Sequence, residues 1–247
     1  MDIVTTKIFS SGVAVLILSI LHISYPFVHT KINKFTGFLV SFSSGIALGY
    51  VFLYMFPKLS DYTLQIAQQS TANSWEFINY RIYLFTLIGL VIYLVVDLYS
   101  ESENKERSII KLFNYAAFCF YSIILGYILA NIPRSGILPI ILITIVLGFH
   151  FFGINHQLFK WNHLIFTRYL RWLLAFSIFV GWLYGIFTPL PKEFVMIATA
   201  FLSGAIIANV MFEELSKRRP TIKPFLTGVM TITVIVAVIR SLPKINY

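Results

Sequence analysis

The chain has 247 residues, of which 58% are hydrophobic and only 12% charged, and its formal net charge is +9. Soluble domains carry about 25% charged residues, so this chain has too few charged side chains to coat a soluble globule, and its apolar surface must face lipid. The basic residues lie between apolar runs, which excludes nucleic-acid binding, and the single cysteine, Cys119, excludes a disulfide framework.

Eight segments are long and apolar enough to be membrane-spanning helices, each of which needs about 20 mostly apolar residues. In chain order we predict them at Ile8–Val28, Phe35–Phe56, Ile82–Tyr99, Ile109–Ala130, Gly136–Gly153, Tyr169–Leu190, Phe194–Phe212 and Ile222–Leu242. The first is interpreted as an uncleaved helix, because no small-x-small cleavage site follows it. We therefore predict an all-α, multi-pass protein of the cell membrane, built as a single transmembrane domain over residues 1–247.

Lysine and arginine are distributed unequally between the loops on the two sides of the predicted membrane. Twelve lie on one side and seven on the other when the eight segments alternate in direction. Cytoplasmic loops carry the excess of Lys and Arg. We therefore predict that both termini are extracytoplasmic.

The second and seventh segments share a short motif. Phe42–Gly49 and Phe201–Ala208 both read Phe-x-Ser-Gly, followed by apolar residues and a small residue four positions after the glycine. The predicted topology gives these two segments opposite directions, and inverted repeats are common in secondary transporters. We predict repeats over residues 8–99 and 169–242 around central helices at 109–153, although small-xxx-small patterns also occur wherever membrane helices pack closely.

Few polar side chains fall at membrane depth, and each is therefore a functional candidate. For His22 we expect a neutral imidazole bonded to a backbone carbonyl. Cys119 is expected to be a small packing residue. Tyr121 and Ser122 either line a polar path or form hydrogen bonds between helices.

The fifth and seventh segments carry the candidate metal ligands. His150, Asn155 and His156 could supply ligands or a proton relay, but the two histidines are six residues apart and lie on different helix faces unless Gly153 breaks the helix. In the seventh segment, ligands of the type that suits a divalent cation come from Asn209, Glu213 and Glu214. The alternative for the two glutamates is pairing with the basic residues at 217–219.

This pattern resembles the ZIP (Zrt/Irt-like) family of divalent-metal transporters. The resemblance rests on the eight spans with outward termini, on the 3+2+3 inverted repeat, and on two motif-bearing stretches, Ser44–Lys58 and Ser203–Leu215. It implies the ZIP fold. The family's binuclear metal site between spans four and five is not implied, because the fourth span reads Phe118-Cys119-Phe120-Tyr121-Ser122, and only His150 remains of the metal-binding motif in the fifth.

We expect a transport-related membrane protein with an altered or lost metal site, with no enzymatic activity and no cofactor. A weak divalent-cation site is expected at the cytoplasmic ends of spans five and seven. Candidate partners are the lipid bilayer, a divalent metal ion and a second copy of the chain. The alternatives are a non-catalytic membrane scaffold and an integral-membrane hydrolase, which would need a nucleophile and base or three metal ligands at membrane depth.

Overall fold

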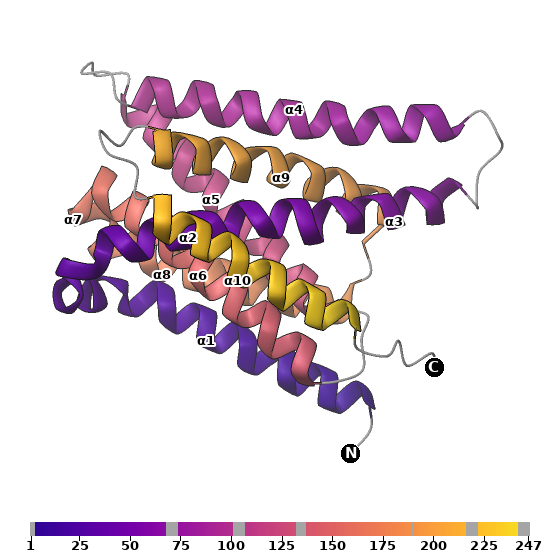
Figure 1. Cartoon of the computed structure of the whole chain (residues 1–247), viewed down its shortest axis with the longest axis horizontal. Coiled ribbons are helices and arrows are strands. Elements are labelled where there is room, and N and C mark those ends of the chain that lie inside the picture. Colours follow the sequence, from indigo (N-terminus) through magenta and orange to yellow (C-terminus); the bar gives the residue numbers. More distant parts are fainter. Residues whose placement is uncertain are drawn as a thin grey trace. The chain divides into compact units, whose positions relative to one another are not determined.

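The computed structural model describes residues 3–67, 74–100, 107–131, 137–188, 190–215 and 222–241. These ranges are helical almost throughout and contain no β-strand (Figure 1). The helices in chain order are α1 (Ile3–Lys31), η1 (Asn33–Phe35), α2 (Thr36–Tyr50), η2 (Val51–Met55), α3 (Phe56–Ala67), α4 (Ser74–Ser100), α5 (Arg107–Ala130), α6 (Ile137–Trp161), α7 (His163–Ile165), η3 (Phe166–Leu170), α8 (Arg171–Phe187), α9 (Lys192–Leu215) and α10 (Ile222–Ser241).

The helices agree in place with the eight predicted spans. Among the described residues, six helical segments are long and apolar enough to cross a membrane, and two shorter apolar helices cover Tyr80–Val95 and Tyr115–Ala130. The second span runs without a break through α2, the π-helical turn η2 and α3, and the sixth runs through α7, the π-helical turn η3 and α8. The prediction of an all-helical, multi-pass membrane protein is confirmed.

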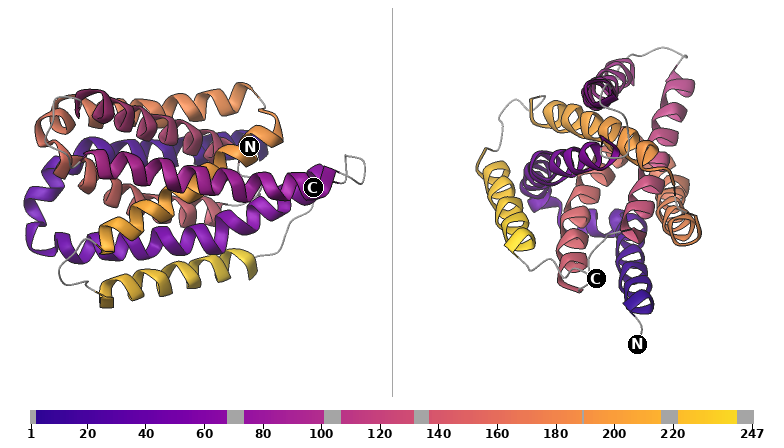
Figure 2. Two further views of the ribbon diagram at one scale, coloured as in Figure 1. Left: turned by 90° about the horizontal axis from the view of Figure 1, so that it is seen from above. Right: turned by 90° about the vertical axis from the view of Figure 1, so that its right-hand side faces the viewer.

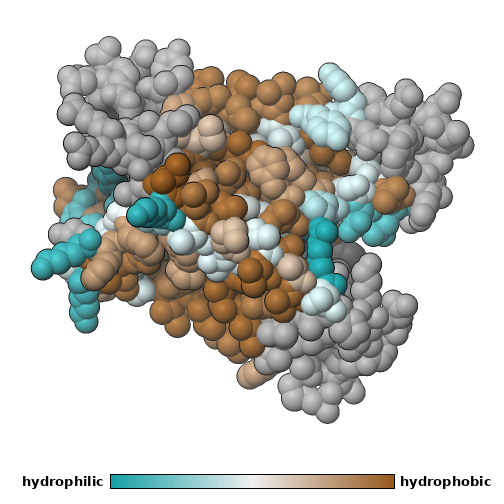
Figure 3. Space-filling view, viewed as in Figure 1, coloured by the Kyte–Doolittle hydropathy of each residue, from teal (hydrophilic) through white to brown (hydrophobic). Residues whose placement is uncertain are grey.

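Large hydrophobic side chains cover the outer faces of these helices. Leu16, Ile17 and Ile20 on α1 and Phe176 on α8 are all exposed. In Figure 3, brown hydrophobic residues cover the surface along α1, whereas teal hydrophilic side chains lie at the end where α1 joins α2. Exposed apolar faces of this length belong against the hydrocarbon core of a bilayer.

The chain forms two compact units. Unit 1 comprises Met1–Ile46, Tyr115–Pro189 and Thr221–Tyr247, and unit 2 comprises Ala47–Asn114 and Leu190–Pro220. The first part of α2 therefore belongs to unit 1 and its last turn to unit 2.

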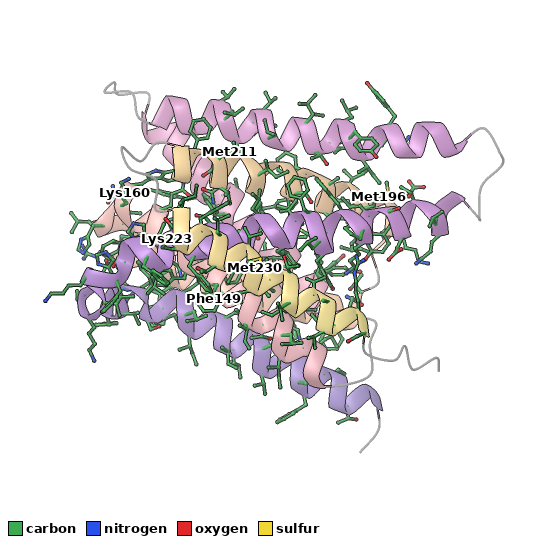
Figure 4. All side chains as sticks on the ribbon, in the orientation of Figure 1. Phe149, Lys160, Met196, Met211, Lys223 and Met230 are labelled. Atoms are coloured by element: carbon green, nitrogen blue, oxygen red, sulfur yellow. The ribbon has the colours of Figure 1, made fainter. Side chains whose placement is uncertain are left out.

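Unit 2 is built around the side-by-side pair α4 and α9 (Figure 1). A β-carbon at Gly204 would lie 1.8 Å from the Thr86 carbonyl oxygen, and one at Gly89 would lie 2.0 Å from the Phe201 carbonyl oxygen. Only glycine allows two helix backbones to approach so closely. Helix α3 adds to this pair, and its Leu59 is buried against Met196 of α9 in the unit's core; Figure 4 labels Met196.

Unit 1 contains two helix crossings of the same kind, each with a glycine on both helices. A β-carbon at Gly45 of α2 would lie 2.1 Å from the Phe225 carbonyl oxygen of α10, and one at Gly228 of α10 would lie 2.2 Å from the Phe42 carbonyl oxygen of α2. Helix α10 accordingly lies along α2 in both views of Figure 2. Gly126 of α5 and Gly181 of α8 form the second crossing of this kind. Helix α1 completes the unit by packing against α6 and α8.

Candidate functional site

Most of the buried polar side chains of unit 1 that meet across helices lie between α1, α5 and α6. Helices α1 and α6 run in the same direction, since His22 contacts Phe151 and Asn155, whereas His29, further along α1, contacts His156 and Phe159 further along α6. This registry aligns one face of α1 with one face of α6. It places imidazole, phenol and amide groups together inside a helix bundle.

His22 is fully buried and bonds to a side chain on α6. Its Nδ1 lies 2.7 Å from the side-chain oxygen of Asn155. An amide oxygen only accepts, so His22 Nδ1 carries the hydrogen, and in the neutral ring Nε2 is left as an acceptor. Nε2 is buried and has no hydrogen-bond partner among the described residues. The expected bond to a backbone carbonyl is thus replaced by a bond to an amide side chain.

His150 is buried on α6 and bonds to α5. The Tyr121 hydroxyl and His150 Nε2 share a hydrogen bond of 2.5 Å, and both side chains are buried. The ring of Phe151, which is 0% exposed, lies against His22 with a centroid distance of 4.5 Å and also contacts the Tyr121 ring. Tyr121 therefore forms a bond between helices, one of the two roles expected for it.

His156 is half-buried and faces α1. Its Nδ1 lies 2.9 Å from the Tyr25 hydroxyl, and its ring stacks on that of His29 with a centroid distance of 5.8 Å. Asn155 and His156 are thus both directed at α1 but meet different residues of it, with Asn155 at His22.

Helix α6 continues through Gly153 to Trp161. The condition under which His150 and His156 could share a helix face, a break at Gly153, is therefore not met. The position instead lets α2 approach, because a β-carbon there would lie 2.8 Å from the Ser43 hydroxyl, which itself donates to the Phe149 carbonyl of α6. His150 and His156 consequently bond to different helices, as their six-residue spacing indicates.

The other predicted ligands belong to unit 2. Asn209 accepts a hydrogen bond of 2.8 Å from the Tyr93 hydroxyl within that unit. Glu213 and Glu214 fall in the last turn of α9, but their side chains lie outside the described residues. Across the part of the chain that the structure describes, no three His, Cys, Asp or Glu side chains gather closely enough to hold a metal ion.

Sequence reasoning did not group three polar residues of α1 that belong to this cluster. His22, Tyr25 and His29 are spaced by three and four residues, which places them on one helix face. That spacing is the signal by which the sequence could have revealed them. Nothing in the sequence alone indicates that this face meets α6.

Pro26 lies near the middle of this face and weakens the backbone of α1. Proline has no N–H, so one hydrogen bond of the helix is lost. Side chains from other helices donate to carbonyls just before it: Asn155 Nδ2 lies 3.5 Å from the Leu21 oxygen, and Arg171 Nη1 lies 3.0 Å from the Ile23 oxygen. These two carbonyls flank that of His22, which is the one that loses its helical donor to Pro26. The Arg171 guanidinium also stacks on Trp172.

The electrostatics of unit 1 are unusual. Its sequence contains ten Lys and Arg residues and one acidic residue, Asp2, whereas unit 2 contains nine of each. All five histidines also belong to unit 1. The polar cluster therefore has no carboxylate from its own unit, and a divalent cation there would lack the anionic ligands that offset its burial.

Comparison of the chain with known protein families, curated proteins and solved structures finds no match.

Proposed function

We propose that this protein is a multi-pass membrane transport protein with ZIP-like architecture and an altered metal site. The observation that carries the proposal is the hydrogen bond between Tyr121 of α5 and His150 of α6. These helices correspond to spans four and five, and polar side chains that face one another across them are what a substrate path requires. In this proposal the protein has no enzymatic activity.

The inverted repeat gains support from the two glycine crossings that involve Gly45 and Gly204. Gly45 approaches the carbonyl three residues before Gly228, and Gly204 approaches the carbonyl three residues before Gly89. The partners are α10 and α4, which the 3+2+3 scheme also pairs with each other. Equivalent crossings at equivalent positions are what two copies of one ancestral triplet would retain.

The substrate path we propose in unit 1 is lined by neutral polar groups. His150, Asn155 and His156 each bond to a different side chain, so they do not supply the three or four converging donors that a zinc site needs. Hard cations need anionic oxygens, which these residues lack. Unit 1 itself contributes no carboxylate to this path, because its single acidic residue is Asp2 at the N-terminus. The altered substrate is therefore a weakly held cation or a different polar solute.

Uptake into proteoliposomes tests this function. The purified protein is reconstituted and assayed with zinc, manganese, iron and cadmium, in the wild type and in the variants Y121F and H150A. The matched control is H163A, since His163 is exposed and its ring lies against that of Phe159. We expect slow uptake of at least one ion that falls in Y121F and H150A but not in H163A. Uptake of none of the four would remove the metal-transport proposal.

A non-catalytic membrane scaffold is the second candidate. It is favoured by the packing of the cluster, in which the ring of Phe151 fills the space between His22 and Tyr121. Replacing Cys119 by Ala and His150 by Cys gives a protein with one thiol at the cluster. Labelling of that thiol by a water-soluble maleimide supports a path, and complete protection supports the scaffold.

A further inference from the structure

A long apolar groove runs along the outside of unit 1. It is lined by α1, α2 and α6, has a volume of about 650 Å³, and reaches on α1 from Phe9 to Val28 and on to Ile32. At 1.5 Å per residue, the stretch from Phe9 to Val28 spans about 28 Å, close to the thickness of a bilayer's hydrocarbon core. Pockets for small ligands have volumes of roughly 300–1,000 Å³, so the groove is large enough to hold a ligand.

The chemistry of the lining suits a hydrocarbon chain. The lining residues are almost all apolar, as are Leu39 of α2 and Phe149 of α6, which Figure 4 labels. The hydroxyl of Thr144 donates to the Ile140 carbonyl of its own helix and so is already engaged. A polar ligand would find few partners here, whereas an acyl chain has no polar group to leave unsatisfied.

One end of the groove carries two exposed lysines. Ile32, which lines that end, lies between Lys31 and Lys34, and both lysines are exposed. Unit 1 contains one acidic residue, Asp2, so no other acidic side chain of the unit can neutralise these charges. Lysines close to the membrane surface, such as these two, attract the headgroups of anionic lipids.

We propose that this groove binds an anionic phospholipid, with an acyl chain along α1 and α6 and the headgroup phosphate at Lys31 and Lys34. A second copy of the chain fits the face less well. Two copies in one bilayer share an orientation, so docking by this same face would bring four lysines to one membrane level. The phosphate of a lipid instead supplies the missing negative charge.

Native mass spectrometry of the full-length protein in detergent tests the headgroup. Dioleoyl phosphatidylglycerol and dioleoyl phosphatidylcholine have the same chains and differ in charge. We expect the wild type to bind the anionic lipid more tightly by about tenfold, and K31Q/K34Q to lose this preference. The control K160Q/R168Q removes the same amount of charge from α6 and η3, and neither residue lines the groove, so we expect this variant to keep the preference.

A second pair of variants tests the groove itself. Ile141 lines the groove and is 44% exposed, so I141W fills the groove without disturbing the core. V234W places the same bulk on the exposed face of α10, outside the lining. We expect I141W to lower binding of both lipids and V234W to leave it unchanged, with both variants eluting and unfolding as the wild type does.

Three results would overturn the proposal. The first is equal affinity of the wild type for the two lipids. The second is equal loss of preference in both charge variants, which would mean that only the general surface charge matters. The third is a shift of I141W from dimer to monomer with lipid binding unchanged, which would assign the groove to a second copy of the chain.

Discussion

At the scale of single residues, the polar cluster of unit 1 is a set of pairs between helices. His22 pairs with Asn155, Tyr121 with His150, and Tyr25 with His156. Each pair satisfies groups that would otherwise be costly at membrane depth. The exception is His22 Nε2, which is buried without a partner among the described residues. The lone pair of this nitrogen can accept a hydrogen bond from a solute.

Removing the Tyr121 hydroxyl should destabilise the protein. Y121F leaves His150 Nε2 without its hydrogen bond, and we expect the free energy of unfolding in detergent to fall by about 1 kcal/mol. Y169F is the control, since Tyr169 is 63% exposed on η3. Chemical unfolding followed by tryptophan fluorescence measures both. Equal stability of Y121F and the wild type would contradict the contact.

The His22–Asn155 pair can be tested by a double-mutant cycle. We expect H22L and N155L to show a coupling free energy of about 0.5–2 kcal/mol, because each removes the partner of the other. His22 and Asn162 serve as the control pair, since Asn162 accepts a hydrogen bond from the Ile165 N–H as the N-cap of α7. Additive effects for both pairs would show that His22 and Asn155 do not interact.

At the scale of elements, glycine decides which helices touch. Three crossings use a glycine on each helix, at Gly45 and Gly228, at Gly89 and Gly204, and at Gly126 and Gly181. In a bilayer, helix association relies on close packing rather than on the hydrophobic effect. Small residues at a crossing therefore fix the partner of a helix more strongly than its apolar content does.

Replacing Gly45 or Gly204 by alanine should destabilise the protein to a similar degree. A β-carbon at Gly45 or Gly204 would meet a backbone carbonyl oxygen at 2.1 or 1.8 Å, so the helices must separate. We expect G45A and G204A each to lower the free energy of unfolding by about 1–3 kcal/mol. G37A is the control, because a β-carbon at Gly37 meets nothing within 4 Å. Thermal unfolding of the three variants in one detergent makes the comparison, and wild-type stability of G45A or G204A would contradict the crossings.

At the scale of the whole molecule, charge is divided between the two units. The net charge of +9 belongs entirely to unit 1, since unit 2 has equal numbers of basic and acidic residues. Electrostatic attraction to anionic lipid headgroups is therefore expected for unit 1, whereas unit 2 is neutral overall. The single-domain organisation over residues 1–247 stays a prediction.

The orientation in the membrane also belongs to this scale. Both termini should be extracytoplasmic, because the loops divide Lys and Arg twelve to seven. Two C-terminal fusions check this, one with a reporter that works only in the cytoplasm and one with a reporter that works only outside it. We expect activity from the second alone, and activity of the cytoplasmic reporter would reverse the topology.

The sequence by itself determined the class of the protein and the places of its spans. Hydropathy is a local property, and about 20 apolar residues in lipid must form a helix because no other structure satisfies the backbone there. Within the described residues, each of the eight expected segments is accordingly helical over most of its length. The Phe-x-Ser-Gly motif also drew attention to Gly45 and Gly204, both of which lie at helix crossings.

Only the tertiary structure decided which polar groups meet. The bond between His22 and Asn155 joins residues 133 positions apart, and that between Tyr25 and His156 joins residues 131 apart. Such pairs depend on the rotation of each helix about its axis and on the choice of neighbour, which packing at glycines and aromatic rings fixes. The tertiary structure also explains why α6 continues through Gly153. This glycine allows α2 to pack closely against α6, and it does not end the helix.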